Sequence, residues 1–188
     1  MKTLKGRTAL VTGASRGLGL YIVRALAREG MNLVLAARSA DKLEAIAGEL
    51  RAGGTEVLCV PTDVGDPESL AGLAARAEME TGGVDLLVNN AGVEHTMPFD
   101  QVPVNILEQT IDVNLRAPMI LSRLLLPHMI ARGRGHIVNI ASGAAYGGIP
   151  YQESYCATKA RFLNLSRSID ATCKLDGHAV GCSTVSHG

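Results

Sequence analysis

Two side chains that can take part in proton transfer lie four residues apart in the segment ESYCATKARF, residues 153–162. On a helix, Tyr155 and Lys159 would share one face, about 6 Å apart along the axis. A free phenol has a pKa of about 10, and a nearby ammonium favours the phenolate and lowers that pKa. The pair suits delivery of a proton to an oxygen at which negative charge develops. An amphipathic helix with a half-buried tyrosine and a solvated lysine would show the same spacing.

A glycine-rich turn near the start of the chain has the residue types of a phosphate-binding loop. The segment TGASRGLG, residues 12–19, joins a strand-like run to a helical one. Glycine lets the backbone approach a pyrophosphate, and the N-terminus of the following helix supplies unpaired N–H groups. Tight packing of a helix on a strand also requires small residues, so the turn alone is a moderate indication. Its spacing, Gly-x-x-x-Gly-x-Gly, differs from the GxGxxG fingerprint of many dinucleotide dehydrogenases.

The elements that must position these groups alternate along the whole chain. Strand-like runs are TALVT, NLVLAA, EVLCV, DLLVN, HIVNI and AVGCSTVS, and helical segments such as LGLYIVRALARE, PESLAGLAARAEME and NLRAPMILSRLLLPHMIAR separate them. This alternation predicts an α/β fold with a doubly wound, Rossmann-like parallel sheet and helices on both faces. Asp66 with Pro67 predicts a helix start, and Gly30 and Gly53 fall just after predicted helix ends.

Length, charge and cysteine usage narrow the class of protein. The 188 residues suit a single domain, and 18 basic against 18 acidic residues give no net charge that would favour nucleic acid or an anionic membrane. We therefore expect small-molecule partners. No apolar run approaches the roughly 20 residues that span a bilayer. The four cysteines form no CxxC pair and no zinc spacing, which predicts buried free thiols, no metal site and a cytoplasmic location.

Five motifs, in this order, resemble the short-chain dehydrogenase/reductase family. They are TGASRGLG, NNAG, the asparagine of IDVN, the serine of NIAS, and YCATK, and the resemblance extends from Gly6 to Val185. Each motif is weak alone, but their joint match is specific. The resemblance implies an oxidoreductase that transfers a hydride between NADP(H) and a carbonyl or alcohol substrate, as a ketone reductase or an alcohol dehydrogenase.

The resemblance implies a catalytic set of Asn114, Ser142, Tyr155 and Lys159. In the family the tyrosine is the acid/base, and the lysine acts on the phenol and on the nicotinamide ribose. The serine polarises the carbonyl, and the asparagine helps to carry a proton relay. Taken singly, Ser142 could be a loop-capping serine and Asn114 a helix-interior hydrogen-bonding residue.

The resemblance also implies a cofactor-binding set, in which NADP is preferred to NAD. Ala37 lies near where NAD-preferring relatives carry an acid, and Arg16 and Arg38 could hold a 2′-phosphate. Surface solvation of Arg38 is the alternative, and Asp63 could instead cap a helix. The NNAG segment could be simply a strand-ending turn. The full set is Gly13, Ser15, Arg16, Gly17, Leu18, Gly19, Arg38, Asp63, Val64, Asn90, Ala91, Gly92, Tyr155 and Lys159.

Four polar or aromatic residues near these motifs receive no functional role. They are Glu94 and His95 after NNAG, and Tyr146 and Tyr151 between Ser142 and Tyr155. Loops near active sites carry many such side chains without a chemical duty, so structural or exposed roles are favoured.

The end of the sequence, AVGCSTVSHG, resembles the sixth strand of the family, where members usually continue with Pro-Gly. We therefore expect residues 1–188 to form a single dinucleotide-binding and catalytic domain that lacks the C-terminal part of the family fold. Weak cofactor binding, poor turnover and an open sixth-strand edge would follow.

Two other functions and one assembly are compatible with the sequence. The first alternative is a catalytically weak or inactive dinucleotide-binding sensor or scaffold. A nucleotide-binding methyltransferase ranks far behind, because it does not require the Ser, Tyr and Lys pattern. The apolar segment NLRAPMILSRLLLPHMI and the helix that follows Tyr155 predict a homodimer or homotetramer, since the equivalent family helices pair across a twofold axis.

Overall fold

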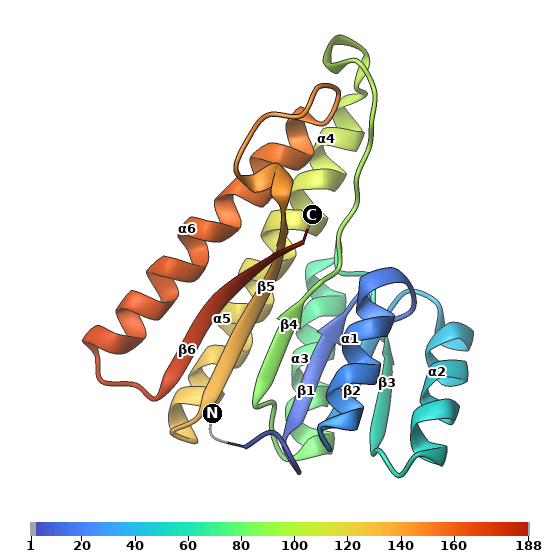
Figure 1. Cartoon of the computed structure of the whole chain (residues 1–188), viewed down its shortest axis with the longest axis vertical. Helices are drawn as coiled ribbons and strands as arrows, with labels where there is room; N and C mark the ends of the chain where they lie inside the picture. The colour runs from blue at the N-terminus through green and yellow to red at the C-terminus, as the bar shows by residue number, and fades with distance from the viewer. Residues whose placement is uncertain (1–2, 188) are drawn as a thin grey trace.

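The computed structural model describes residues 3–187, which form one six-stranded parallel sheet in the order β3-β2-β1-β4-β5-β6 (Figure 1). The order reverses direction between β1 and β4, so the predicted doubly wound sheet is confirmed. The strands are β1 Thr8–Thr12, β2 Asn32–Ala37, β3 Val57–Pro61, β4 Leu86–Asn89, β5 Gly135–Ser142 and β6 Val180–His187.

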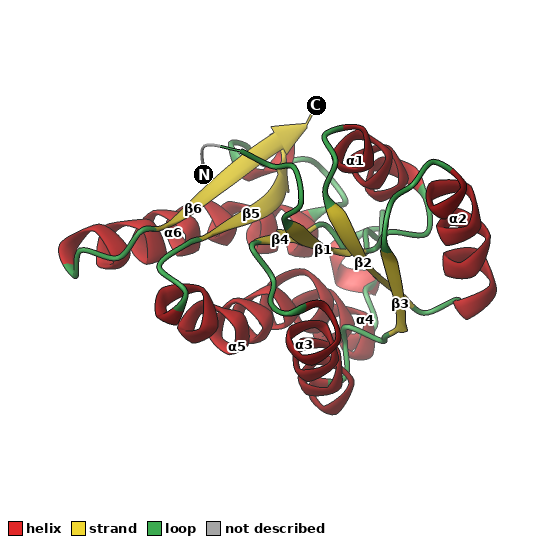
Figure 2. Cartoon of the chain, turned by 90° about the horizontal axis from the view of Figure 1, so that it is seen from below, coloured by secondary structure: helices red, strands yellow, loops and turns green. Residues whose placement is uncertain are grey.

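Helices cover both faces of the sheet, as the alternation predicts (Figure 2). Helices α1 and α2 lie on one face beside β1, β2 and β3, whereas α3, α5 and α6 lie on the other. The helices are α1 Gly17–Arg28, α2 Ala40–Ala52, α3 Pro67–Thr81, α4 Val104–Ile111, α5 Ala117–Ala131 and α6 Glu153–Leu175. Three short helical segments complete the fold, namely η1 Phe99–Gln101, η2 Asp112–Arg116 and η3 Gly143–Ala145.

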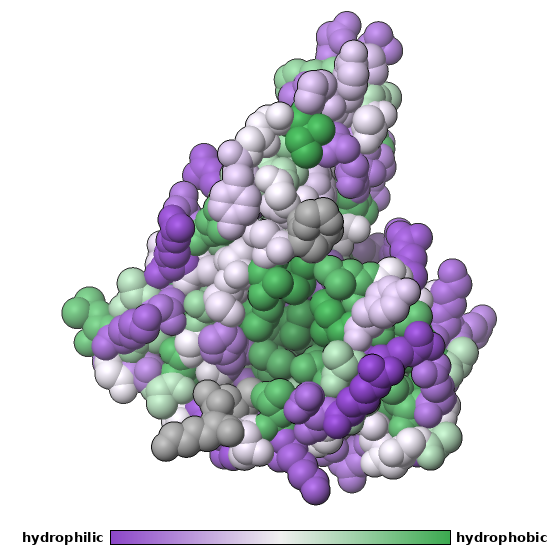
Figure 3. Space-filling model, viewed as in Figure 1, coloured by the Kyte–Doolittle hydropathy of each residue, from purple (hydrophilic) through white to green (hydrophobic). Residues whose placement is uncertain are grey.

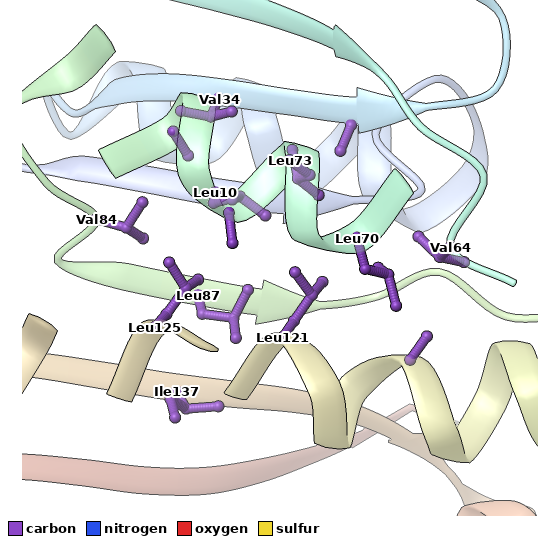
Figure 4. Packing of buried hydrophobic residues seen from close by; sticks show 14 of the residues in the cluster. Leu10, Val34, Val64, Leu70, Leu73, Val84, Leu87, Leu121, Leu125 and Ile137 are labelled. Atoms are coloured by element: carbon purple, nitrogen blue, oxygen red, sulfur yellow. The ribbon is translucent and has the colours of Figure 1, made fainter. Parts of the chain in front are cut away.

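The hydrophobic core is divided into two layers by the sheet. Side chains of alternate strand positions point to opposite faces, so Leu10 packs against α3 and α5 while its neighbour Val11 packs beneath α1 and α2. Figure 4 shows Leu10 and Leu87 of the strands meeting Leu73, Leu121 and others from the helices. Every residue of β1 is buried, as is typical of a central parallel strand.

Local signals in the sequence set the helix ends. The carboxylate of Asp66 accepts hydrogen bonds from the N–H groups of Glu68 and Ser69, and Pro67 occupies the first position of α3. Gly53 is the C-cap of α2, and Gly30, with φ of 77°, follows the C-cap of α1. The predicted starts and ends at these positions are confirmed.

The apolar helical region around Asn114 is not one regular helix. A π-helical segment, η2, interrupts it between α4 and α5, and Asn114 lies buried inside that segment. Wider π turns of this kind occur mostly as single turns inside α-helices and are frequent at functional sites. Here the wider turn coincides with the amide side chain of Asn114, which is hydrogen-bonded to the backbone of Val93 rather than to its own helix.

The face of the sheet that carries α1 and α2 has no helix over β5 and β6 within residues 3–187 (Figure 2). Figure 3 shows apolar residues gathered in the hollow between β6 and α1. Val138 of β5 is partly buried there, and Val185 of β6 is half exposed. Strand β6 forms an edge of the sheet in the described residues, as the sequence predicts for the sixth strand.

Candidate active site

The carboxyl ends of the parallel strands meet at one edge of the sheet, where a cavity of about 810 Å³ opens beside the switch point between β1 and β4. All the residues expected at the cofactor line this cavity except Tyr155 and Lys159, which line a smaller cavity next to it. Those that line the large cavity are Gly13, Ser15, Arg16, Gly17, Leu18, Gly19, Arg38, Asp63, Val64, Asn90, Ala91 and Gly92.

The glycine turn leaves the start of α1 open. Gly13 and Gly17 have φ of 67° and 53°, a left-handed conformation that suits glycine. Arg16 occupies the N-cap position of α1 without making a side-chain capping bond. The first N–H groups of α1 therefore face the cavity without an internal partner, and the helix dipole favours an anion there.

Gly19 is required because the turn packs directly on it. A Cβ atom at position 19 would lie 2.2 Å from the carbonyl oxygen of Gly13 and 2.7 Å from Nδ2 of Asn90. We expect Gly19→Ala to lower the free energy of unfolding by about 1–3 kcal/mol, as is typical of overpacking, in urea titrations followed by circular dichroism.

Gly48 in α2 is the matched control for Gly19, because a Cβ atom there meets nothing within 4 Å. Gly48→Ala should raise the free energy of unfolding by up to about 1 kcal/mol through helix propensity. Equal effects of the two substitutions would contradict the packing argument.

The NNAG segment supports the glycine turn. Thr12 Oγ1 accepts hydrogen bonds from the N–H groups of Asn90 and Ala91, both at 3.1 Å. In return, Nδ2 of Asn90 donates to the carbonyl oxygens of Thr12 at 2.9 Å and Gly13 at 3.3 Å. The segment is thus a strand-ending turn and a wall of the cavity at the same time.

Positively charged side chains gather where β2 ends. Arg16 and Arg38 line the large cavity, and so does Lys42 in the first turn of α2. No ion pair joins any of the three to a carboxylate within the described residues. Sequence reasoning missed Lys42, although its place at the start of a predicted helix, just after the carboxyl end of the second predicted strand, could have identified it.

Asp63 and Val64, which follow β3, line the same cavity next to the end of β2. Asp63 Oδ1 accepts a hydrogen bond from the N–H of Gly65 at 2.9 Å, while Asp66 rather than Asp63 caps α3. Val64 is almost fully buried. The alternative role of Asp63 as a helix cap is therefore wrong.

Tyr155 and Lys159 share the smaller cavity, of about 180 Å³, with Glu94 and Ile140. Lys159 Nζ lies 5.7 Å from the centre of the Tyr155 ring and donates a 2.9 Å hydrogen bond to the carbonyl oxygen of Ile140. The lysine is only 3% exposed, so the alternative of a solvated lysine is wrong. Burial lowers the pKa of Lys159 to about 8, because the charged form loses solvation.

The expected lowering of the pKa of Tyr155 does not occur in this structure. Burial of the phenol raises its pKa, since desolvation disfavours the phenolate, and the hydroxyl of Ser142 offsets only part of that shift. The phenol is consequently protonated at neutral pH and available as a proton donor. The expectation considered the charge of Lys159 but not the loss of solvation of Tyr155 and Lys159 on burial.

Asn114 and Ser142 flank this pair but do not line the smaller cavity. Asn114 Oδ1 accepts from the N–H of Val93, and Nδ2 donates to the Val93 carbonyl, both at 2.8 Å. Nδ2 also lies 3.3 Å from Oγ1 of Thr158 on α6. Asn114 therefore ties the segment after NNAG to the helix that carries Tyr155 and Lys159.

A buried row of polar side chains holds α6 against the sheet, and sequence reasoning missed it. Asn89 Nδ2 donates to Asn139 Oδ1, and Asn139 Nδ2 donates to Ser166 Oγ on α6, both at 2.8 Å. Because buried polar groups need partners, this row fixes the helix in one position. The polar residues within the strands DLLVN and HIVNI were the available signal.

Other kinds of site are not indicated in residues 3–187. All four cysteines are free, three of them buried and Cys59 partly so, and no group of three potential ligands could hold a metal ion in this part of the chain. No helix in the same residues has the length and apolar character needed to cross a bilayer.

Comparison with known families and proteins identifies related chains. A sequence model described as short chain dehydrogenase matches residues 7–188. The ketoacyl reductase HetN of Nostoc sp. is 42% identical over 163 residues, and the gluconate 5-dehydrogenase of Gluconobacter oxydans is 35% identical over 167. These alignments cover 87% and 89% of this chain but 57% and 65% of the relatives, so the chain spans less than two thirds of their length.

Solved structures give the same relationship. A metagenomic short-chain oxidoreductase in complex with NADP superimposes with a TM-score of 0.93 at 37% identity, covering 98% of this chain and 83% of the other. A short chain dehydrogenase/reductase from Burkholderia phymatum in complex with NAD gives a TM-score of 0.95 at 33% identity, with coverage of 99% and 66%.

Proposed function

Because this chain belongs to the short-chain dehydrogenase family, we propose that it is an oxidoreductase that interconverts a carbonyl compound and an alcohol with NADP(H). The observation that carries the proposal is the buried Tyr155 and Lys159 pair beside an open helix N-terminus and glycine turn. In this proposal residues 1–188 act as a single dinucleotide-binding and catalytic domain. The names of the related proteins, a ketoacyl reductase and a gluconate dehydrogenase, fit the same class of reaction.

The residues of the large cavity fit a dinucleotide. The uncapped start of α1 and the left-handed turn at Gly13 and Gly17 would receive the pyrophosphate, because the first N–H groups of α1 have no internal partner. Asp63 and Val64 would flank the adenine end, and Lys159 would hold the nicotinamide ribose. When bound, NADPH supplies the hydride and NADP⁺ accepts it.

The protein's own side chains manage the proton. As a carbonyl carbon gains a hydride, its oxygen gains the electron pair of the C=O bond, and Tyr155 transfers its phenolic proton to that oxygen. Ser142 would hydrogen-bond the same oxygen, and Asn114 would contribute to the relay that returns a proton to the phenolate. For alcohol oxidation each transfer runs in the opposite direction.

A spectrophotometric assay tests the proposal. Oxidation of NADPH would be followed by its absorbance with a panel of ketones, and reduction of NADP⁺ with the matching alcohols. Turnover above the rate without substrate supports the proposal. Binding of NADP(H) without turnover of any substrate would instead favour the second candidate, a dinucleotide-binding sensor or scaffold.

The preference for NADP over NAD is proposed from the charges at the end of β2. Ala37 contributes no carboxylate that would repel a 2′-phosphate, while Arg16, Arg38 and Lys42 line the cavity and form no ion pair with any residue that the structure describes. Arg38→Asp should weaken NADP⁺ binding by about 1.5–3 kcal/mol and change NAD⁺ binding far less. Calorimetric titration with both cofactors checks this, and Arg28→Asp, at the distant end of α1, is the control.

The same titrations can contradict the cofactor proposal in two ways. Equal losses of NADP⁺ and NAD⁺ affinity in Arg38→Asp would mean that Arg38 does not recognise the 2′-phosphate. Tighter binding of NAD⁺ than NADP⁺ by the unaltered protein would reverse the preference.

We further propose a small-molecule carbonyl or alcohol as the substrate and a homodimer or homotetramer as the assembly. Three exposed apolar side chains support the assembly, namely Val104 and Ile111 at the two ends of α4 and Met119 on α5. We expect light scattering at micromolar concentration to give a mass of at least two chains, and a monomer mass would contradict this.

A further inference from the structure

The smaller cavity carries a carboxylate that the proposed chemistry does not use. Glu94 lines it together with Tyr155 and Lys159, two positions after Gly92 of the NNAG segment. The ammonium of Lys159 is engaged by the carbonyl oxygen of Ile140. Lys159 and Glu94 are the charged residues that line this cavity, and of the two Glu94 is the one that can interact with a substrate.

Two loops hold Glu94 in place. Gln152 Nε2 donates to Glu94 Oε1 at 2.5 Å and also lies 3.3 Å from Oγ1 of Thr96. The N–H of Met97 donates to the carbonyl oxygen of Tyr151 at 3.1 Å, which joins the same two loops a second time. Within the described residues Oε2 of Glu94 has no hydrogen-bond donor, so one oxygen is anchored and the other can accept from a ligand.

The charge of Glu94 acts on the reacting group. Burial is the main cause of the raised pKa of Tyr155, and the negative charge of Glu94 raises that pKa further. A carboxylate that influences the phenol through space will also interact with a charged substituent on a carbonyl compound bound at that phenol.

We propose that Glu94 determines substrate specificity, favouring carbonyl compounds that bear an ammonium or hydroxyl group beside the reacting carbon and disfavouring keto acids. This inference rests on the proposed reductase function. A charge-assisted hydrogen bond from an ammonium to Oε2 is stronger than one from a neutral hydroxyl, whereas a substrate carboxylate would meet like charge. The expected order of preference is ammonium, hydroxyl, carboxylate.

Three ketones of matched size test the order, namely 1-aminobutan-2-one, 1-hydroxybutan-2-one and 2-oxobutanoate. Each would be assayed with NADPH at slightly acidic pH, where the amine is protonated. In Glu94→Gln, kcat/KM for the amino ketone should fall about 10–100-fold, mainly through KM, and that for 2-oxobutanoate should rise. The hydroxy ketone should change least, because the amide oxygen can still accept its hydrogen bond.

Asp100→Asn is the matched control, since it removes one negative charge from the same segment outside the cavity. It should leave the order of the three ketones unchanged. If the unaltered protein reduces the ketones but Glu94→Gln leaves their ranking unchanged, or if Asp100→Asn changes it equally, the specificity role is wrong. If no ketone is reduced by the unaltered protein, the proposed function fails first and the inference with it.

Discussion

Replacing Tyr155 with phenylalanine should reduce kcat by about 10²–10⁴-fold, the contribution of a well-positioned acid or base. The substitution removes the hydroxyl and keeps the ring, and the ring is nearly buried at 8% exposure. NADPH affinity should therefore change little, because packing beside Lys159 is preserved. Stopped-flow measurement of hydride transfer, together with fluorescence titration of NADPH, separates the two effects.

Tyr146→Phe is the control for Tyr155→Phe. Tyr146 is exposed, lies nine residues earlier, and its hydroxyl contacts Ser186 rather than the catalytic cavity. The Tyr146→Phe variant should retain kcat within about twofold, because Tyr146 is exposed and does not line the catalytic cavity. If Tyr155→Phe kept comparable activity, another group would have to supply the proton.

The fold was predictable because its signals are local and repeated. Strands such as TALVT are continuous apolar runs, and a parallel sheet covered on both faces requires such runs. Asp66 with Pro67 fixes the start of α3 through contacts within three residues. The π turn around Asn114 could not be read in this way, because its stabilising partner, Val93, lies 21 residues away.

The candidate site was predictable as a list of residues but not as an electrostatic environment. The motifs indicated which side chains belong together, and the two cavities bring most of them to one sheet edge, although Asn114 and Ser142 line neither cavity. Desolvation depends on everything that surrounds a group, so the directions of the Tyr155 and Lys159 pKa shifts required the packed structure. The anchoring of Glu94 by Gln152 spans 58 residues and was equally invisible in the sequence.

Lys159→Met should make the protein more stable and much less active. Burial lowers the pKa of Lys159 from 10.5 to about 8, which corresponds to a cost of about 3 kcal/mol for keeping the folded protein's lysine charged at pH 7. Methionine fills a similar volume without that cost, although the Ile140 carbonyl loses its donor. We expect the free energy of unfolding to rise by about 1–3 kcal/mol at pH 7, while kcat falls about 10²–10³-fold through loss of the positive charge.

The unaltered protein and Lys159→Met should differ in their free energy of unfolding by an amount that depends on pH, and this dependence identifies the cause of the difference. Below pH 8 the lysine is charged in both states of the unaltered protein, so the full cost is present and the difference between the two proteins is constant. Between pH 8 and 10.5 the unfolded state binds more protons than the folded state, so the stability of the unaltered protein rises toward that of Lys159→Met. Urea unfolding across this range measures the convergence, and Lys42→Met, which removes an exposed lysine, should show none. Equal stabilities at pH 7 would mean that the buried ammonium carries no cost and that the electrostatic account of the pair is wrong.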